Sequence, residues 1–322
     1  MARSFRLRGL VLALLSLCTP AHGVIAARHR PAEWPVLAEP TAADRVLIIT
    51  PHVDDEAIAA AGFVQAARAR GAQVDVVYLT AGDNNRTSAE ILDRSLFPGA
   101  AAYLREGEVR YREALEAMSR LDVASAHVFL LGYPDRGLAL MLRNPRQVIR
   151  SPGTGKTAVP YREAVSPGAD YRLDNLLADL DRVLRSVRPT IVLLPVPFDA
   201  HPDHSAGGKI ALRAVAASGL APSLLGYLVH ARHFPSPFLS APARPLNPPR
   251  AFRGEDWTAF PLTREQEVRK RLVLQAYGSQ RRDPYLLLLT NAFVRRNELF
   301  VRLQMPVAMA QEGASHSEGG WP

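Results

Sequence analysis

The sequence contains a single cysteine, Cys18, in a chain of 322 residues. This cysteine falls inside an N-terminal stretch that we expect to be removed, so the mature protein would contain no thiol. That absence excludes disulfide bonds and every metal site that depends on cysteine ligands. Any transition metal must therefore be held by histidine and carboxylate side chains.

The chain also lacks a long apolar run at its N-terminus. Residues 1–23 show the three-part pattern of a secretory signal peptide: three arginines, a short apolar segment at 10–17, and small residues near a cleavage site at 21–23. The apolar segment is shorter than the about 20 residues that a membrane span needs, and an uncleaved anchor is the alternative. We expect an exported protein, periplasmic or extracellular, with no stable membrane span after cleavage.

Lysine is scarce, and nearly all the cations behind the net charge of +8 are arginines. These arginines alternate with acidic residues along the predicted helices, as in residues 105–110. A dense basic run with interleaved aromatic residues, which would favour nucleic-acid binding, does not occur. We therefore expect solvated helix faces and no nucleic-acid partner.

Two nucleotide-binding motifs are missing. A Gly-x-Gly-x-x-Gly sequence does not follow the first predicted strand, which argues against a dinucleotide-dependent oxidoreductase. Residues 153–157, Gly-Thr-Gly-Lys-Thr, look like part of a phosphate-binding loop, but Arg150 stands where the first glycine of that motif belongs. Strands and helices do not flank this segment as the motif requires.

What is present is an alternation of apolar β-branched segments with amphipathic ones, which predicts right-handed βαβ units. The fold class we expect is α/β, a Rossmann-like three-layer fold with a mainly parallel central sheet flanked by helices. The expected strands are 45–50, 73–80, 127–131, 190–195 and 224–229, and the expected helices are 55–70, 100–121, 173–187, 205–217 and 263–277. Residues 285–303 are expected to form a helix and then an edge strand, and 143–172 and 235–261 to form loops.

The expected domain organisation places this fold in residues 43–304. The leader at 1–23 comes first, a proline-containing linker at 24–42 follows it, and a disordered tail occupies 305–322. The sequence shows no internal repeat. It gives no indication of oligomeric state.

Two clusters of histidine and aspartate stand at the carboxyl ends of predicted strands. The first, residues 51–56, is Pro-His-Val-Asp-Asp-Glu, and the second, residues 201–204, is His-Pro-Asp-His. Open α/β sheets bind their ligands at this edge, and imidazole and carboxylate are ordinary zinc ligands. The two clusters can therefore converge on one metal ion.

These clusters resemble the two motifs of the PIG-L/LmbE-like family of zinc-dependent de-N-acetylases. The family usually shows His-Pro-Asp-Asp-Glu and His-Pro-Asp-His, so only Val53 departs from the pattern. Further pieces follow in family order over about residues 43–282: they are Thr80-Ala81-Gly82, Arg110, Glu113, Leu131-Gly132-Tyr133-Pro134-Asp135, Lys270 and Tyr277-Gly278-Ser279-Gln280. Either motif alone would be weak, whereas the ordered set is specific.

The resemblance implies a role for each matching residue. The zinc (Zn²⁺) ligands would be His52, Asp55 and His204. Asp54 would be the general base, His201 would stabilise the oxyanion, and Asp203 would hold the His201 imidazole oriented and protonated. Substrate contacts would come from Arg110 and Asp135, and Glu56 would have a supporting role. The expected substrate is an N-acetylated sugar of the N-acetylglucosamine type, as a glycan, glycolipid or glycoconjugate.

Several alternatives stay open at the level of sequence. The acidic residues at 54–56 also suit simple capping of a helix N-terminus, and His230 and His233 follow a strand as possible ligands. A non-catalytic carbohydrate-binding relative with the same fold is one rival function. An amidase that acts on a non-sugar amide is another.

Overall fold

The computed structural model describes residues 34–305. The predicted signal peptide 1–23, the first part of the predicted linker, and the predicted tail beyond residue 305 lie outside the described residues. A seven-stranded sheet forms the centre, in the order β3-β2-β1-β4-β5-β7-β6. The strands are β1 Arg45–Thr50, β2 Gln73–Thr80, β3 Val128–Tyr133, β4 Ile191–Pro195, β5 Ser223–Tyr227, β6 Trp257–Pro261 and β7 Asn297–Leu303.

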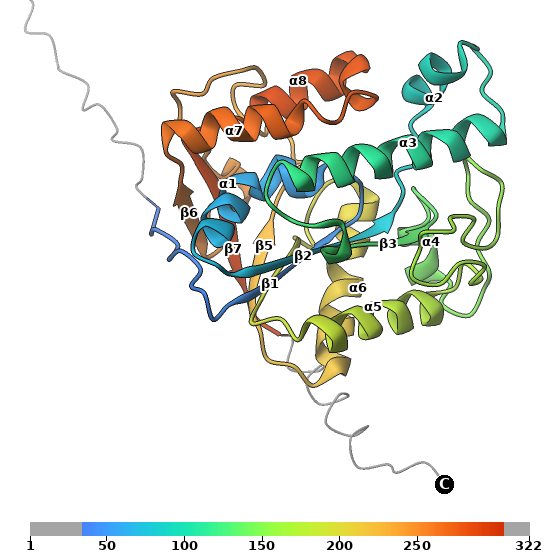
Figure 1. Cartoon of the computed structure of the whole chain (residues 1–322), viewed down its shortest axis with the longest axis horizontal. Coiled ribbons are helices and arrows are strands. Elements are labelled where there is room, and N and C mark those ends of the chain that lie inside the picture. Colours follow the sequence, from blue (N-terminus) through green and yellow to red (C-terminus); the bar gives the residue numbers. More distant parts are fainter. Residues whose placement is uncertain (1–33, 306–322) are drawn as a thin grey trace, which may run out of the picture. The chain divides into compact units, whose positions relative to one another are not determined.

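Strands β1 to β5 are parallel, and β7 pairs antiparallel with both β5 and β6. The eight α-helices of the described residues are α1 Asp55–Ala69, α2 Arg86–Asp93, α3 Ala100–Ser119, α4 Leu138–Arg143, α5 Leu173–Val187, α6 Pro202–Ser218, α7 Arg264–Leu274 and α8 Pro284–Ala292. Helix α7 contacts α1 and α3 on one face of the sheet, and α6 contacts α4 and α5 on the other (Figure 1). The expected three-layer α/β fold with a mainly parallel sheet is confirmed.

The central strand β1 explains where the site lies. Its apolar residues are fully buried because helices cover both faces of the sheet. It pairs with β2 on one side and with β4 on the other, so the strand order reverses between β1 and β4. Ligands of open α/β sheets bind at such a switch point. The two histidine clusters follow these two adjacent strands.

The structure corrects several expectations drawn from the sequence. The segment 235–261 is not all loop, since its end forms β6, and β7 lies inside the sheet rather than at its edge. Helices α2 and α4 were not expected. Residues 34–37, assigned to a linker, instead run along β6: the backbone NH of Ala259 donates to the carbonyl of Pro35, and the NH of Leu37 donates to the carbonyl of Ala259. This segment covers the outer edge of β6, which would otherwise be unpaired.

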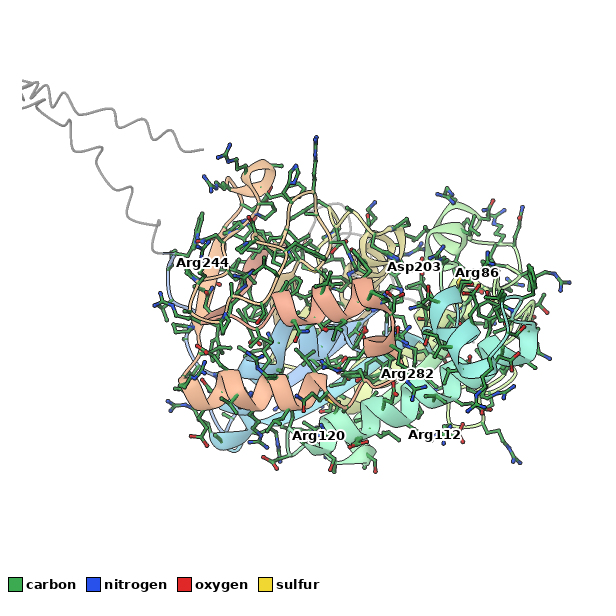
Figure 2. All side chains as sticks on the ribbon, turned by 90° about the horizontal axis from the view of Figure 1, so that it is seen from above. Arg86, Arg112, Arg120, Asp203, Arg244 and Arg282 are labelled. Atoms are coloured by element: carbon green, nitrogen blue, oxygen red, sulfur yellow. The ribbon has the colours of Figure 1, made fainter. Side chains whose placement is uncertain are left out.

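Arginines occur over much of the described structure (Figure 2). Those labelled in Figure 2 lie in α2, in α3 and directly after it, in the loop before β6 and in the segment before α8. Within residues 34–305, each helix is too short or too polar to cross a membrane.

A buried ion pair anchors α1 to α7 and β7, which come much later in the sequence. The ammonium of Lys270 donates to Glu298 at 2.7 Å, and the same carboxylate accepts the backbone NH groups of Gly62 and Phe63 at 2.8 Å each. Both charged side chains are 1% exposed. The pair therefore joins α1, α7 and β7 around one carboxylate.

We expect Lys270→Met to lower the free energy of unfolding by about 3–5 kcal/mol, because it leaves the buried Glu298 carboxylate without its cation. Urea denaturation measures this change. The matched control is Lys209→Met, since Lys209 is exposed on α6 and forms none of the ion pairs among residues 34–305. The control should stay within about 0.5 kcal/mol of the parent. Equal midpoints for the two variants would contradict the structural role of the pair.

Candidate metal centre

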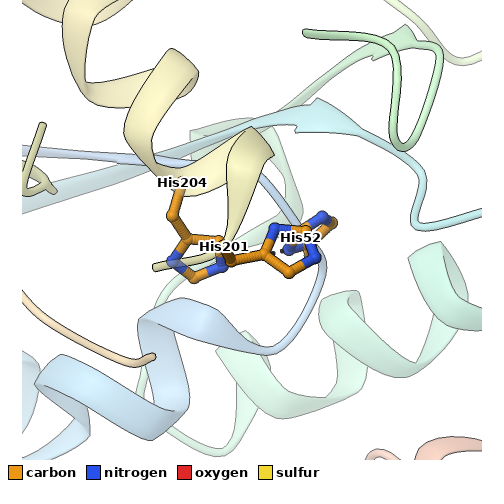
Figure 3. Close-up of side chains that lie close together, drawn as sticks. All are labelled: His52, His201 and His204. Carbon is orange, nitrogen blue, oxygen red and sulfur yellow. Dashed lines mark hydrogen bonds between the residues drawn. The ribbon is translucent and has the colours of Figure 1, made fainter. Parts of the chain in front are cut away.

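The two sequence clusters meet at the carboxyl ends of β1 and β4. Figure 3 shows His52 from the β1–α1 turn beside His201 and His204 from the start of α6. Helix α6 begins at Pro202, three residues before the expected start at 205, so the second motif forms its first turn. The helix lies so close to β4 that a Cβ on Gly208 would collide with the carbonyl oxygen of Pro195.

Three donor atoms form a compact triangle at this point. His52 Nδ1 lies 3.2 Å from His204 Nε2 and 3.5 Å from Asp55 Oδ2. His204 Nε2 lies 3.3 Å from Asp55 Oδ2. A tetrahedral metal ion with ligand atoms at about 2.0–2.1 Å separates them by about 3.3–3.4 Å. The triangle therefore matches one face of a tetrahedral coordination shell, with the fourth position left for water or substrate.

The other ring nitrogen of each histidine faces a carboxylate. His52 Nε2 lies 3.3 Å from Asp135 Oδ1, and His204 Nδ1 lies 3.3 Å from Asp199 Oδ2; both are ion-pair contacts rather than aligned hydrogen bonds. Metal-bound histidines usually donate their free N–H to such a partner, which fixes the tautomer. The surrounding carboxylates thus fit a metal held through His52 Nδ1 and His204 Nε2.

Two other groups of side chains among residues 34–305 also bring donor atoms within 4.8 Å of one another. They are His52 with His201 and His204, and His52 with Asp135 and Asp203. We favour the triangle with Asp55 because both of its histidines have a carboxylate next to the ring nitrogen that does not belong to the triangle. These carboxylates are Asp135 for His52 and Asp199 for His204. The role of each ligand remains a prediction from the sequence.

The charges around the triangle suit a cation. Burial alone would raise the pKa of Asp55, but the nearby His204 and His52 hold it well below its ordinary value. Burial opposes protonation of His204, yet Asp55 and Asp199 together raise its pKa to about 9. The buried carboxylates therefore stabilise positive charge in this cluster, and a bound metal ion would supply that charge in place of protons on the histidines.

Asp54 sits beside the triangle in an unusual backbone conformation, with φ at 142°. It precedes α1, but its side chain accepts no capping hydrogen bond, so helix capping does not explain this residue. Its carboxylate lies 3.4 Å from the Arg110 guanidinium. Burial raises the pKa of Asp54 to about 7, against the effect of Arg110. A carboxylate with a pKa near 7 suits general base catalysis at neutral pH.

Arg110 and Asp135, expected to contact substrate, both line a cavity of about 270 Å³ that His52 and Asp55 of the triangle also line. Arg110 also donates to the carbonyls of Gly82 and Val53, at 2.8 Å each. A side chain at Gly82 would collide with this guanidinium, and Gly82 has a positive φ of 65°. Arg110 thus ties two loops together beneath Asp54.

The contact between Asp203 and His201 differs from the expectation. The backbone NH of Asp203 donates to His201 Nδ1 at 3.3 Å, whereas the Asp203 carboxylate accepts from the backbone NH of Arg136 and lies 3.8 Å from His52 Nε2. Burial, followed by the charges of His52 and His204, lowers the pKa of His201 to about 4. The backbone NH of Asp203, rather than its carboxylate, contacts this ring, and the lowered pKa favours the neutral form of His201.

Sequence reasoning missed Asp199, and it did not pair Glu56, to which it gave a supporting role, with Tyr277. Asp199 accepts the backbone NH groups of His201, Val229 and His230, and so organises the loop behind His204. The Tyr277 hydroxyl donates to Glu56, whose other oxygen accepts the NH of Asp54 at 3.3 Å. A hint of Asp199 existed in its position two residues before His201.

The two additional histidines separate in the structure. The His230 ring lies 4.7 Å from the His204 ring, centroid to centroid, and lines the same cavity. His230 is not part of the triangle or of the two other groups of donor atoms named above. His233 lines a different cavity.

We expect Asp199→Asn to weaken metal affinity about 10–100-fold, because the partner of His204 Nδ1 loses its charge. Competition with a metal-sensitive chelator dye measures the affinity. The control is Asp170→Asn, a change on an exposed residue far along the chain from either motif. An unchanged dissociation constant for Asp199→Asn would show that this carboxylate shapes the loop only.

The family model for GlcNAc-PI de-N-acetylases (PIG-L) matches residues 47–215, which hold both histidine clusters and the strands that position them. The chain belongs to the PIG-L family. The family resemblance drawn from the sequence is thereby confirmed.

Curated members of the PIG-L family match over part of their length. A 1D-myo-inositol 2-acetamido-2-deoxy-alpha-D-glucopyranoside deacetylase from Catenulispora acidiphila is 34% identical over 55% of this chain and 50% of its own. A diacetylchitobiose deacetylase from Thermococcus kodakarensis is 28% identical over 55% of this chain and 51% of its own. The chain thus spans about half the length of the curated relatives it matches.

Solved structures share the fold. The N,N'-diacetylchitobiose deacetylase from Pyrococcus horikoshii aligns with a TM-score of 0.50 at 21% identity, over 84% of this chain and 87% of that protein. At this level of identity the similarity establishes the PIG-L fold alone.

Proposed function

We propose that this PIG-L family member is a zinc-dependent hydrolase that removes an acetyl group from an N-acetylated amino sugar. The observation that carries the proposal is the triangle of His52 Nδ1, Asp55 Oδ2 and His204 Nε2, with Asp54 in the same cavity. Histidine and carboxylate ligands with one open position are typical of catalytic zinc. The names of the relatives, which describe deacetylases of 2-acetamido sugars and diacetylchitobiose, support the substrate class.

The residues of this site divide the chemistry between them. A zinc ion, when bound, would polarise the acyl oxygen and acidify water. Asp54 receives the proton of the attacking water and passes it to the departing amine. The NH of Asp203 occupies His201 Nδ1, so the proton of this neutral ring lies on Nε2, where it can be donated to the acyl oxygen.

Acetate release from a panel of N-acetylated sugars, measured with the zinc-loaded protein, tests this function. We expect release from N-acetylglucosamine-type compounds and none after metal removal. Saturable sugar binding without acetate release would favour a carbohydrate-binding relative. Release only from amides that carry no sugar would favour the amidase alternative.

We propose further that the protein is exported, on the basis of the three-part pattern in residues 1–23. Mass spectrometry of the protein recovered from its native host should find a mature start near residues 22–28. Recovery of a cytosolic protein with Met1 intact would contradict export.

A further inference from the structure

A second and larger cavity, of about 730 Å³, is formed by the segments that follow β5 and precede β6. Its lining contains three arginines and one histidine but no carboxylate. The charged or titratable members are Arg232, His233, Arg250 and Arg253. The cavity around the metal triangle, in contrast, is lined by four aspartates as well as two arginines. We call the larger space the arginine cavity.

The three guanidinium groups of the arginine cavity have no acidic partners. None of the ion pairs or side-chain hydrogen bonds found within residues 34–305 involves Arg232, Arg250 or Arg253. Elsewhere in the structure arginines are commonly paired, as Arg185 is with Asp181 on α5. Three like charges around one space repel one another unless an anion joins them.

The floor of the arginine cavity is apolar and buried. Phe234, Pro248 and Pro249 are buried there, while the guanidinium groups stand at the exposed rim. A cavity of this volume falls within the range of small-molecule sites, which combine an apolar wall with a few polar groups that fix orientation. The guanidinium fork suits phosphate and carboxylate groups in particular, because it can donate two parallel hydrogen bonds.

The arginine cavity adjoins the metal centre. Arg232 stands two residues after His230, which lines the metal cavity, so their Cα atoms are at most about 7 Å apart. On the other side, the Phe252 ring packs against Phe198 with centroids 4.6 Å apart, and Phe198 directly precedes Asp199. The loops near the metal ligands therefore contact the segments that form the arginine cavity.

We infer that the arginine cavity binds an oxyanion, a phosphate or carboxylate group, that the N-acetylated substrate carries next to the sugar being deacetylated. The inference rests on the proposed function for the link to substrate, but the anion site itself does not depend on it. The substrate class is thereby narrowed to anionic N-acetylated glycans or glycoconjugates. Arg232 and Arg250 act as binding residues, and the reaction at the metal centre is unchanged by them.

Direct binding of inorganic phosphate tests the site without any reference to catalysis. Isothermal titration of the full chain should show phosphate affinity that falls about tenfold or more in Arg232→Ala/Arg250→Ala, because each lost charged donor removes a charge-assisted bond. The double variant should fold normally, since both side chains are exposed and unpaired. Arg213→Ala, which removes an exposed arginine from α6, is the control and should bind as the parent does. Equal phosphate affinity in parent and double variant would overturn the site.

Acetate release then tests the link to substrate. For N-acetylglucosamine 1-phosphate the KM should rise about tenfold in the double variant, with kcat unchanged, while KM for neutral N-acetylglucosamine stays the same. Lost phosphate binding with an unaltered KM for both sugars would show a site for free phosphate and overturn the substrate assignment. If the parent released acetate from none of the sugars, the proposed function would be refuted. The phosphate titration would still show whether the arginine cavity binds an oxyanion.

Discussion

Asp54→Asn is expected to lower the rate of acetate release about 10²–10⁴-fold while the metal stays bound. Asparagine keeps the shape of the side chain but cannot accept the proton of the attacking water. The structure places Asp54 in the same cavity as the triangle, next to Arg110 rather than within the set of ligand atoms. Its loss should therefore affect kcat far more than metal content or substrate binding.

Steady-state kinetics measure the rate of acetate release, and elemental analysis measures the metal content of the same variant. Asp174→Asn serves as the matched control, because Asp174 is an exposed residue at the start of α5. Acetate release by Asp54→Asn at the parental rate would show that another group accepts the proton. A loss of metal in this variant would instead make Asp54 a ligand.

His204→Ala is expected to abolish metal binding and, with it, activity. The His204 side chain is completely buried, and its Nε2 lies within 3.3 Å of both other donor atoms of the triangle. Cysteine is absent from the described residues, so the site contains no thiolate that could take over the lost coordination bond. Alanine leaves two ligands, one fewer than a catalytic site of this type contains.

Metal content per chain, determined by elemental analysis after dialysis, measures this second effect. His127→Ala is a suitable control, since His127 contacts Asp75 at 2.8 Å near the start of β3 and takes no part in the metal-binding groups. Full metal content in His204→Ala would direct attention to the alternative group of His52, Asp135 and Asp203.

The parts of the fold that the sequence predicts well are those set by local pattern. Helix α5 was expected at 173–187 and spans Leu173–Val187, because its apolar residues recur at helical spacing. The capping box that starts α7, with Thr263 and Gln266, is present as expected. Both histidine clusters were found for the same reason, since strand, turn and helix follow one another within a few residues.

The parts that the sequence did not predict depend on distant partners. Glu56 hydrogen-bonds Tyr277 across 221 residues, and the strand β6 is defined by its pairing with β7. The strand β6 was not predicted because the sequence before it is rich in proline. Residues 34–37 were assigned to a linker because the strand that they pair with, β6, was not expected. Asp199 received no role because it organises the site through backbone NH groups, which leave no trace in residue type.

The carboxylate of Glu298 also has a consequence for the order in which the newly made chain folds. It holds the backbone of α1 at Gly62, 236 residues earlier in the sequence. A ribosome adds about 5–20 residues per second, so α1 waits many seconds for this anchor. During that interval both histidine clusters have emerged, but the helix that carries Asp55 has no partner on β7. The anchor of the helix that carries Asp55 therefore forms only after residue 298 has been added, so we expect α1 to gain its full stability late in the synthesis of this domain.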